Sequence, residues 1–222
     1  ASEPVRGAEQ ECGCAEGAVL PRWVEGLRAR EIRVAAGLGG KKVEVVCGGA
    51  PCQGFSMIGQ RVLDEPRNRL VRDFLRSTAE LDATYFVFEN VKGLTVGKHK
   101  KFLTEFIEYA NELGYEVRTP WQVLDAANYC VPQHRERLIL FGAKTGKQLP
   151  DYPELQTNPA DGKRKFIPGK PVGPSTADAL SDLPDAEQFK ELRTTDEVPF
   201  TSWGKGSKYS EEMRCRTNAP LH

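Results

Sequence analysis

Short apolar runs alternate with helical patterns over the first 143 residues of this 222-residue chain. The runs at 43–47, 85–88 and 138–141 are typical of buried strands, and residues 115–124 are also strand-like. Apolar residues at helical spacing predict helices at 20–36, at 68–81, where Asn68 is a candidate N-cap, and at 102–113. Strands and helices in this alternation predict an open, mostly parallel α/β sheet.

Candidate chemistry follows two of the predicted strands. Cys52 lies on a turn rich in glycine and proline after the first strand, and Glu89 directly follows the second. Ligands of such sheets bind outside the carboxyl ends of the strands, so we expect this thiol and this carboxylate on one rim. Alone, Cys52 is weak evidence, because free cysteine is usually a small buried hydrophobe. A third polar group, residues 133–137, comes just before the last strand.

The pattern changes near residue 145. Prolines recur from Pro150 to Pro199, basic residues cluster at 163–165, and periodicity is poor apart from 176–183. We therefore expect a domain at 1–145 and the beginning of a loop-rich second region at 146–222.

Composition narrows the class of protein only slightly. The chain has 31 basic and 31 acidic residues, so contacts with a nucleic acid would rest on local patches. No apolar run approaches the roughly 20 residues of a membrane span, and no secretory signal is recognisable. Cys12 and Cys14 have no second pair at zinc-ligand spacing, so no metal site is expected. The scattered cysteines fit a reducing cytoplasm.

Four motifs, in order, resemble those of one enzyme family. They are Gly48–Ser56 with a Pro-Cys-Gln core, Arg67–Leu70, Phe88–Val91 with a Glu-Asn pair, and Asn128–Arg137 ending in Gln-x-Arg-x-Arg. They are similar to motifs of the DNA (cytosine-5)-methyltransferase family, strongly over 43–143 and loosely to 222. The resemblance implies a Rossmann-like S-adenosylmethionine-dependent methyltransferase fold. It also implies that residues 1–145 are a catalytic domain and 146–222 the lead-in to a target-recognition region.

The resemblance implies transfer of a methyl group from S-adenosyl-L-methionine to C5 of a flipped cytosine in double-stranded DNA. Cys52 would form a covalent adduct at C6, Glu89 would act at N3, and Arg135 and Arg137 would hold the base carbonyl and orient Glu89. The implied substrate-binding residues are Pro51, Gln53, Ser56, Arg61, Asn90 and Gln133. The implied cofactor-binding residues are Gly49, Pro51 and Leu70.

Some family features are not found in the sequence. No Phe-x-Gly-x-Gly loop, which binds the methyl donor in the family, lies upstream of Val43, and the family's C-terminal motifs are not seen before His222. We therefore expect missing segments or a second chain to complete the cofactor site, and this chain alone to bind the methyl donor weakly.

Several functions stay open on the sequence alone. The main expectation is a bacterial enzyme, cytoplasmic or nucleoid-associated, that belongs to a restriction–modification system or acts as an orphan. A transfer-RNA cytosine-5 methyltransferase of the same family and a non-catalytic DNA-binding regulatory subunit are the alternatives. A cysteine hydrolase would need a histidine base, and His99 and His134 have no suitable context.

Overall fold

The computed structural model describes residues 26–51, 68–95, 100–162, 166–199 and 203–214. The chain divides into two compact units, which are described separately. The first comprises Ala1–Val123 with Arg137–Tyr152, and the second comprises Leu124–Glu136 with Pro153–His222. The division predicted from the sequence, a catalytic domain at 1–145 and the lead-in to a target-recognition region at 146–222, stays a prediction.

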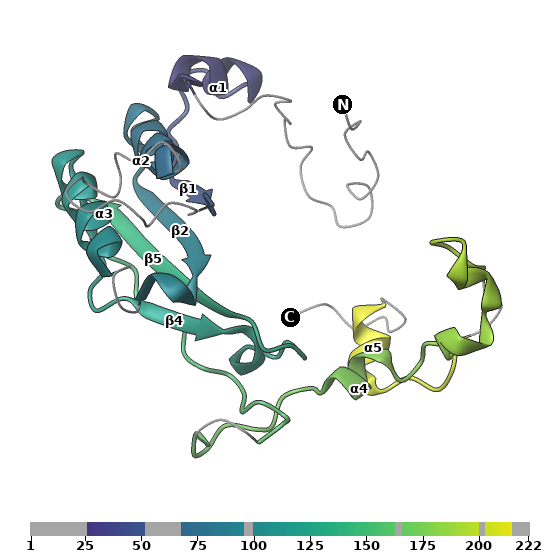
Figure 1. Cartoon of the computed structure of the whole chain (residues 1–222). Coiled ribbons are helices and arrows are strands. Elements are labelled where there is room, and N and C mark those ends of the chain that lie inside the picture. Colours follow the sequence, from purple (N-terminus) through teal and green to yellow (C-terminus); the bar gives the residue numbers. More distant parts are fainter. Residues whose placement is uncertain (1–25, 52–67, 96–99, 163–165, 200–202, 215–222) are drawn as a thin grey trace. The chain divides into compact units, whose positions relative to one another are not determined.

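A mixed sheet forms the centre of the first unit (Figure 1). Its strands lie in the order β1 (Val45–Gly48), β2 (Tyr85–Val91), β5 (Glu136–Lys144) and β3 (Tyr115–Val117), and β4 (Gln122–Asp125) also pairs with β5. β1 and β2 are parallel, whereas β5 is antiparallel to both β2 and β3. Three strands therefore share one direction and β5 is reversed. The α/β class is as expected, but the described pairing is mixed rather than mostly parallel.

The reversal of β5 decides what meets at the rim of the sheet. In the β2–β5 register, Glu89 lies opposite Ile139 and Val91 lies opposite Arg137. Because the two strands are antiparallel, the beginning of β5 lies beside the end of β2. Arg137, near the beginning of β5, is thus a neighbour of the last residues of β2.

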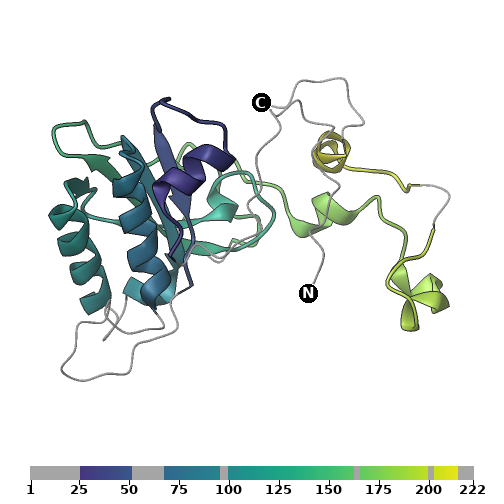
Figure 2. The same ribbon diagram turned by 90° about the horizontal axis from the view of Figure 1, so that it is seen from above.

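Two helices cover one face of this sheet, α2 (Arg69–Glu80) and α3 (Lys100–Glu112), and they lie side by side in Figure 2. Side chains alternate along β2, so Phe86 and Phe88 point to the same face and are fully buried. The ring of Phe74 on α2 lies edge-on to Phe86 at 5.8 Å between centroids, and Phe88 lies 4.8 Å from Phe106 of α3. These aromatic contacts form the core that fixes β2 in place.

The remaining helices are short. α1 (Ala29–Ala35) precedes β1, and the 3-10 turns Lys92–Thr95 and Ala126–Asn128 follow β2 and β4. In the second unit, α4 (Thr176–Leu180) is followed by the 3-10 turns Ala186–Gln188 and Lys190–Arg193, and then by α5 (Lys208–Met213). No helix in the described part of the chain is long and apolar enough to cross a membrane.

The structure corrects three expectations about the elements. The helix predicted at 20–36 begins only at Ala29 within the described residues, which start at 26. Asn68 is the N-cap of α2, but its side chain makes no capping hydrogen bond, because its backbone (φ −103°, ψ 5°) is not in the extended conformation typical of capping residues. The strand predicted at 115–124 is broken into β3 and β4, since residues 118–121, which include Pro120, lie between them.

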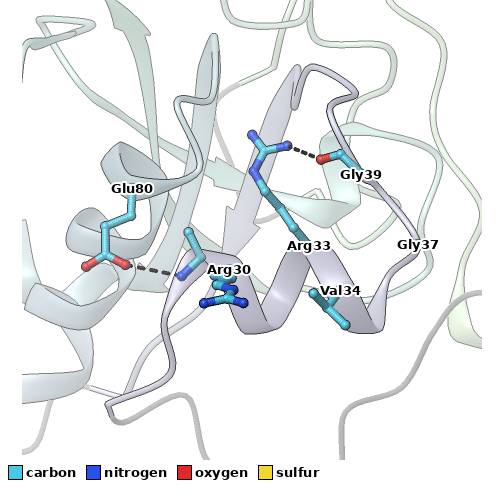
Figure 3. Close-up of a pocket in the computed structure, with 7 residues that line it drawn as sticks. Arg30, Arg33, Val34, Gly37, Gly39 and Glu80 are labelled. Carbon is cyan, nitrogen blue, oxygen red and sulfur yellow. Dashed lines mark hydrogen bonds between the residues drawn. The ribbon is translucent and has the colours of Figure 1, made fainter.

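Charged side chains join α1 to the end of α2. Glu80 accepts hydrogen bonds from Arg76 at 2.8 Å, from Arg28 at 2.9 Å and from the N–H of Ala29 at 3.2 Å. The hydrogen bond from Arg76 is the main reason that the pKa of Glu80 falls to about 2, although desolvation opposes it. An ionised Glu80 therefore ties the first turn of α1 to α2 (Figure 3).

A glycine is required where β5 crosses the aromatic core. A Cβ on Gly142 would lie 2.0 Å from the ring of Phe86, its partner on β2. We expect Gly142→Ala to lower the free energy of unfolding by about 1–3 kcal/mol, because the ring and both strands must shift. Urea denaturation measures this. Gly40→Ala is the control, since a Cβ on Gly40 meets nothing within 4 Å, and equal stability of the two variants would contradict the prediction.

The Glu80 network predicts acid sensitivity. The pKa of Glu80 in the folded protein, about 2, lies below the ordinary 4.5. The contribution of Glu80 to the free energy of unfolding is therefore complete above pH 4.5 and is lost as the pH falls through about 2. We expect Glu80→Gln to lower the free energy of unfolding by roughly 1 kcal/mol at pH 6 and to make it depend less on pH between 4.5 and about 2. Urea denaturation at several pH values checks this. Glu108→Gln, at an exposed position on α3, should retain the wild-type profile.

Candidate functional site

The side chains of Glu89 and Arg137 meet at the rim of the sheet. The Arg137 Nε atom lies 2.7 Å from Oε1 of Glu89, and the side chains are 26% and 40% exposed. Both point to the same face, because Glu89 is opposite Ile139 and Arg137 is two residues before Ile139. The carboxylate is thus oriented by a cation while part of it stays accessible to a ligand.

The end of β1 approaches this pair closely. A Cβ on Gly49 would lie 2.9 Å from Oε2 of Glu89, so any larger residue there would displace the carboxylate. The buried side chain of Asn90 donates from Nδ2 to the carbonyl of Ala50 at 2.8 Å, and its Oδ1 accepts from the N–H of Val91. β2 therefore holds the backbone at the point where the chain enters the Cys52 segment.

The other predicted site residues of this region are located only in part. Pro51 is exposed beside Ala50, and Leu70 is half-buried in the first turn of α2. Cys52, Gln53, Ser56 and Arg61 lie outside the described residues, as do Cys12, Cys14 and His99.

The second unit carries Gln133 and Arg135, which are both exposed and belong to the segment before β5. Asp125 holds this segment: its Oδ1 accepts the backbone N–H of Arg135 at 3.0 Å, and its Oδ2 lies 2.8 Å from Nδ1 of His134. The Nε2 atom of His134 lies 3.1 Å from Asp161. Sequence reasoning missed this cluster, because no local pattern joins three residues so far apart in the sequence.

These contacts shift two pKa values. The hydrogen bond to Asp125 raises the pKa of His134 above its ordinary value, against a smaller desolvation effect, and Asp161 adds to the increase. Desolvation alone would raise the pKa of Asp125, but the hydrogen bonds from His134, Arg135 and Ala127 together lower it. The pair is therefore stabilised as imidazolium and carboxylate.

One open pocket lies elsewhere in the first unit. It has a volume of about 640 Å³ beside α1 and the end of α2 (Figure 3). Its lining contains none of the predicted site residues; it consists of Ala29, Arg30, Arg33, Val34, Gly37, Gly39 and Glu80.

Comparisons with known proteins identify the family of this chain. The model of the C-5 cytosine-specific DNA methylase family matches residues 28–214. The Type II methyltransferase M.XorII of Xanthomonas oryzae pv. oryzae is 44% identical over 219 residues, which cover 98% of this chain and 48% of that protein. M.AquIA of Picosynechococcus sp. is 35% identical over 73% of this chain and 69% of its own length. This chain thus spans about half the length of M.XorII.

Solved structures share the fold. A protein described as a DNA modification methyltransferase encoded within a prophage (E. coli) aligns with a TM-score of 0.51 at 27% identity, over 74% of this chain and 41% of its own. A mutant of DNMT2 from Spodoptera frugiperda aligns with a TM-score of 0.50 at 21% identity, over 77% of this chain and 47% of its own. At this identity the similarity supports the fold alone. The sheet described above is that of a Rossmann-like methyltransferase, as the motifs led us to expect. Because the family model matches most of its length, the chain belongs to the C-5 cytosine-specific DNA methylase family.

Proposed function

We propose that this chain carries the catalytic centre of a DNA (cytosine-5-)-methyltransferase that modifies double-stranded DNA. The observation that supports this most directly is the position of the Glu89 carboxylate. It lies 2.7 Å from Arg137 and faces Gly49, three residues before Cys52. Membership of the C-5 cytosine-specific DNA methylase family supports the same reaction.

Each residue has a chemical task in this reaction. C5 of cytosine is too weak a nucleophile to take a methyl group unaided. The Cys52 thiolate adds to C6, forming an S–C6 bond and moving electron density to C5 and N3. Glu89, in its protonated form, donates a hydrogen bond or its proton to N3, where negative charge would otherwise build up. Loss of the C5 proton and of the Cys52 thiolate after methylation restores the aromatic ring.

The arginines and the polar residues position the base. Arg137 orients Glu89 through the 2.7 Å contact, and Arg135 contributes a guanidinium to the carbonyl oxygen of the base. The base must leave the helix to reach such a site, since its ring atoms are not accessible within a duplex. The remaining proposed contacts to the flipped nucleotide and its strand come from Pro51, Gln53, Ser56, Arg61, Asn90 and Gln133.

S-adenosyl-L-methionine supplies the methyl group in this proposal. The residues proposed to hold the donor are Gly49, Pro51 and Leu70, of which Gly49 directly follows β1. Pro51 is exposed and Leu70 is half-buried, so both can contact the donor.

The biological setting that we propose is a bacterial restriction–modification system, acting in the cytoplasm on the nucleoid. The support is the similarity to bacterial Type II methyltransferases. The rest of the donor site would come from segments outside this chain or from a second chain.

Cys52→Ser tests the nucleophile. We expect methylation of duplex DNA to fall by at least about 10³-fold, because a serine hydroxyl is far less ionised than a thiol. Incorporation of labelled methyl groups by the whole protein measures this, with duplex DNA and transfer RNA as separate substrates. Cys130→Ser, which alters an exposed cysteine of the second unit, is the control. Labelling of transfer RNA alone, or full activity of Cys52→Ser, would contradict the proposal.

Glu89→Gln tests the proton donor. We expect a loss of about 10²–10⁴-fold in kcat, as for removal of a general acid, with little change in DNA affinity. Single-turnover methylation and a DNA-binding titration separate the two quantities. Glu116→Gln replaces an exposed carboxylate on β3 and should behave as wild type. If the Glu89→Gln variant methylates DNA at the wild-type rate, Glu89 has no role at N3.

A further inference from the structure

His134 lies between two carboxylates of the second unit. Its Nδ1 atom is 2.8 Å from Oδ2 of Asp125, and its Nε2 atom is 3.1 Å from Oδ2 of Asp161. Ionised carboxylates only accept hydrogen bonds, so each ring nitrogen must donate. The geometry therefore favours the imidazolium form, with a proton on both nitrogens.

The second oxygen of Asp125 holds the backbone of the same segment. Oδ1 accepts the N–H of Arg135 at 3.0 Å and that of Ala127 at 3.2 Å, and the carbonyl of Arg135 accepts the N–H of Ala126. Asp125 is only 9% exposed, which strengthens these contacts. One carboxylate thus fixes the backbone of Arg135 and the imidazolium next to it.

The other end of this segment is anchored independently. Thr157 accepts from the N–H of Cys130 at 3.2 Å and donates from Oγ1 to the carbonyl of Ala127 at 2.9 Å. The side chain of Asn128 donates to the carbonyl of Thr157 at 2.9 Å. Removal of the imidazolium should therefore loosen the Arg135 end without unfolding the segment.

We propose that His134 is a positioning residue for Arg135. The imidazolium of His134, held between Asp125 and Asp161, fixes how Arg135 presents its guanidinium to the target base. The inference rests on the proposed function, because the task of Arg135 comes from that reaction. Among the described residues, the charged groups that face the His134 ring are Asp125, at the end of β4, and Asp161. Arg135 directly follows His134 in the chain.

The bridge makes the position of Arg135 dependent on pH. Asp125 holds the pKa of His134 above its ordinary 6.5, so both contacts are complete below pH 6.5. As the pH rises through the raised pKa, the ring keeps one N–H and one carboxylate loses its donor. Methylation activity is therefore expected to fall on the alkaline side of the pH profile. Ionisation of the Cys52 thiol would have the opposite effect, because it makes the nucleophile more reactive as the pH rises.

Two substitutions and a control test the bridge in the whole protein through the pH profile of kcat/KM for DNA methylation. We expect wild type to lose activity with a midpoint above pH 6.5. His134→Asn should lack this limb and be about tenfold less active at pH 6.5, the usual effect of losing one charge-assisted hydrogen bond. Asp161→Asn should shift the midpoint to lower pH. Asp196→Asn, at an exposed position, should match wild type.

Hydrogen–deuterium exchange of the peptide spanning 125–136 gives a readout independent of catalysis. After correction for intrinsic rates, protection of the Arg135 amide should fall in wild type above the His134 pKa, and should be insensitive to pH in His134→Asn. Asp125→Asn retains the oxygen that accepts from Arg135 and Ala127, so it should keep protection but lose the pH dependence.

The outcomes separate this inference from the proposed function. An alkaline limb that survives in His134→Asn, or protection of Arg135 that never varies with pH, would overturn the positioning role. If wild type methylates no DNA at any pH while the exchange results appear as expected, the proposed function fails and the imidazolium bridge is upheld.

Discussion

The site depends on one strand pairing, that of β5 against β2 in the reverse direction. If β5 ran parallel to β2, its first residues, which include Arg137, would lie at the opposite end of the strands, away from Glu89. The antiparallel register instead places Arg137 diagonally across from Glu89, with 2.7 Å between Nε and Oε1. Arg137 near the beginning of β5 and Glu89 near the end of β2 thereby become neighbours.

Tight packing keeps that pairing in register. Phe86 and Phe88 point into the core beneath α2 and α3, so a slip of one residue would turn them outward and bury Glu89. Glycines occur where the backbone approaches these rings, since a Cβ on Gly142 would meet Phe86 and one on Gly48 would meet Phe74. The same alternation that buries the phenylalanines exposes Glu89 on the opposite face.

In each unit a carboxylate contacts residues of the Gln133–Arg137 motif. Glu89 is oriented by a guanidinium in the first unit, and Asp125 holds the backbone of Arg135 and the ring of His134 in the second. The two carboxylates differ in accessibility: Glu89 is 40% exposed in its side chain, whereas Asp125 is almost buried. This difference suits one to contact a ligand and the other to hold the protein's own backbone.

Periodicity located most strands and helices of the first unit, because it records which faces are buried, and the motifs marked Glu89, Arg135 and Arg137. The predictions from the sequence that were wrong are the single strand at 115–124, which is broken into β3 and β4, and the cap at Asn68, whose backbone is not extended. The direction of β5, the contact of Glu89 with Arg137, and the bridge from Asp125 through His134 to Asp161 were decided by tertiary structure. Strand direction and contacts between residues distant in the chain depend on how whole elements pack, and no local pattern of residues specifies them.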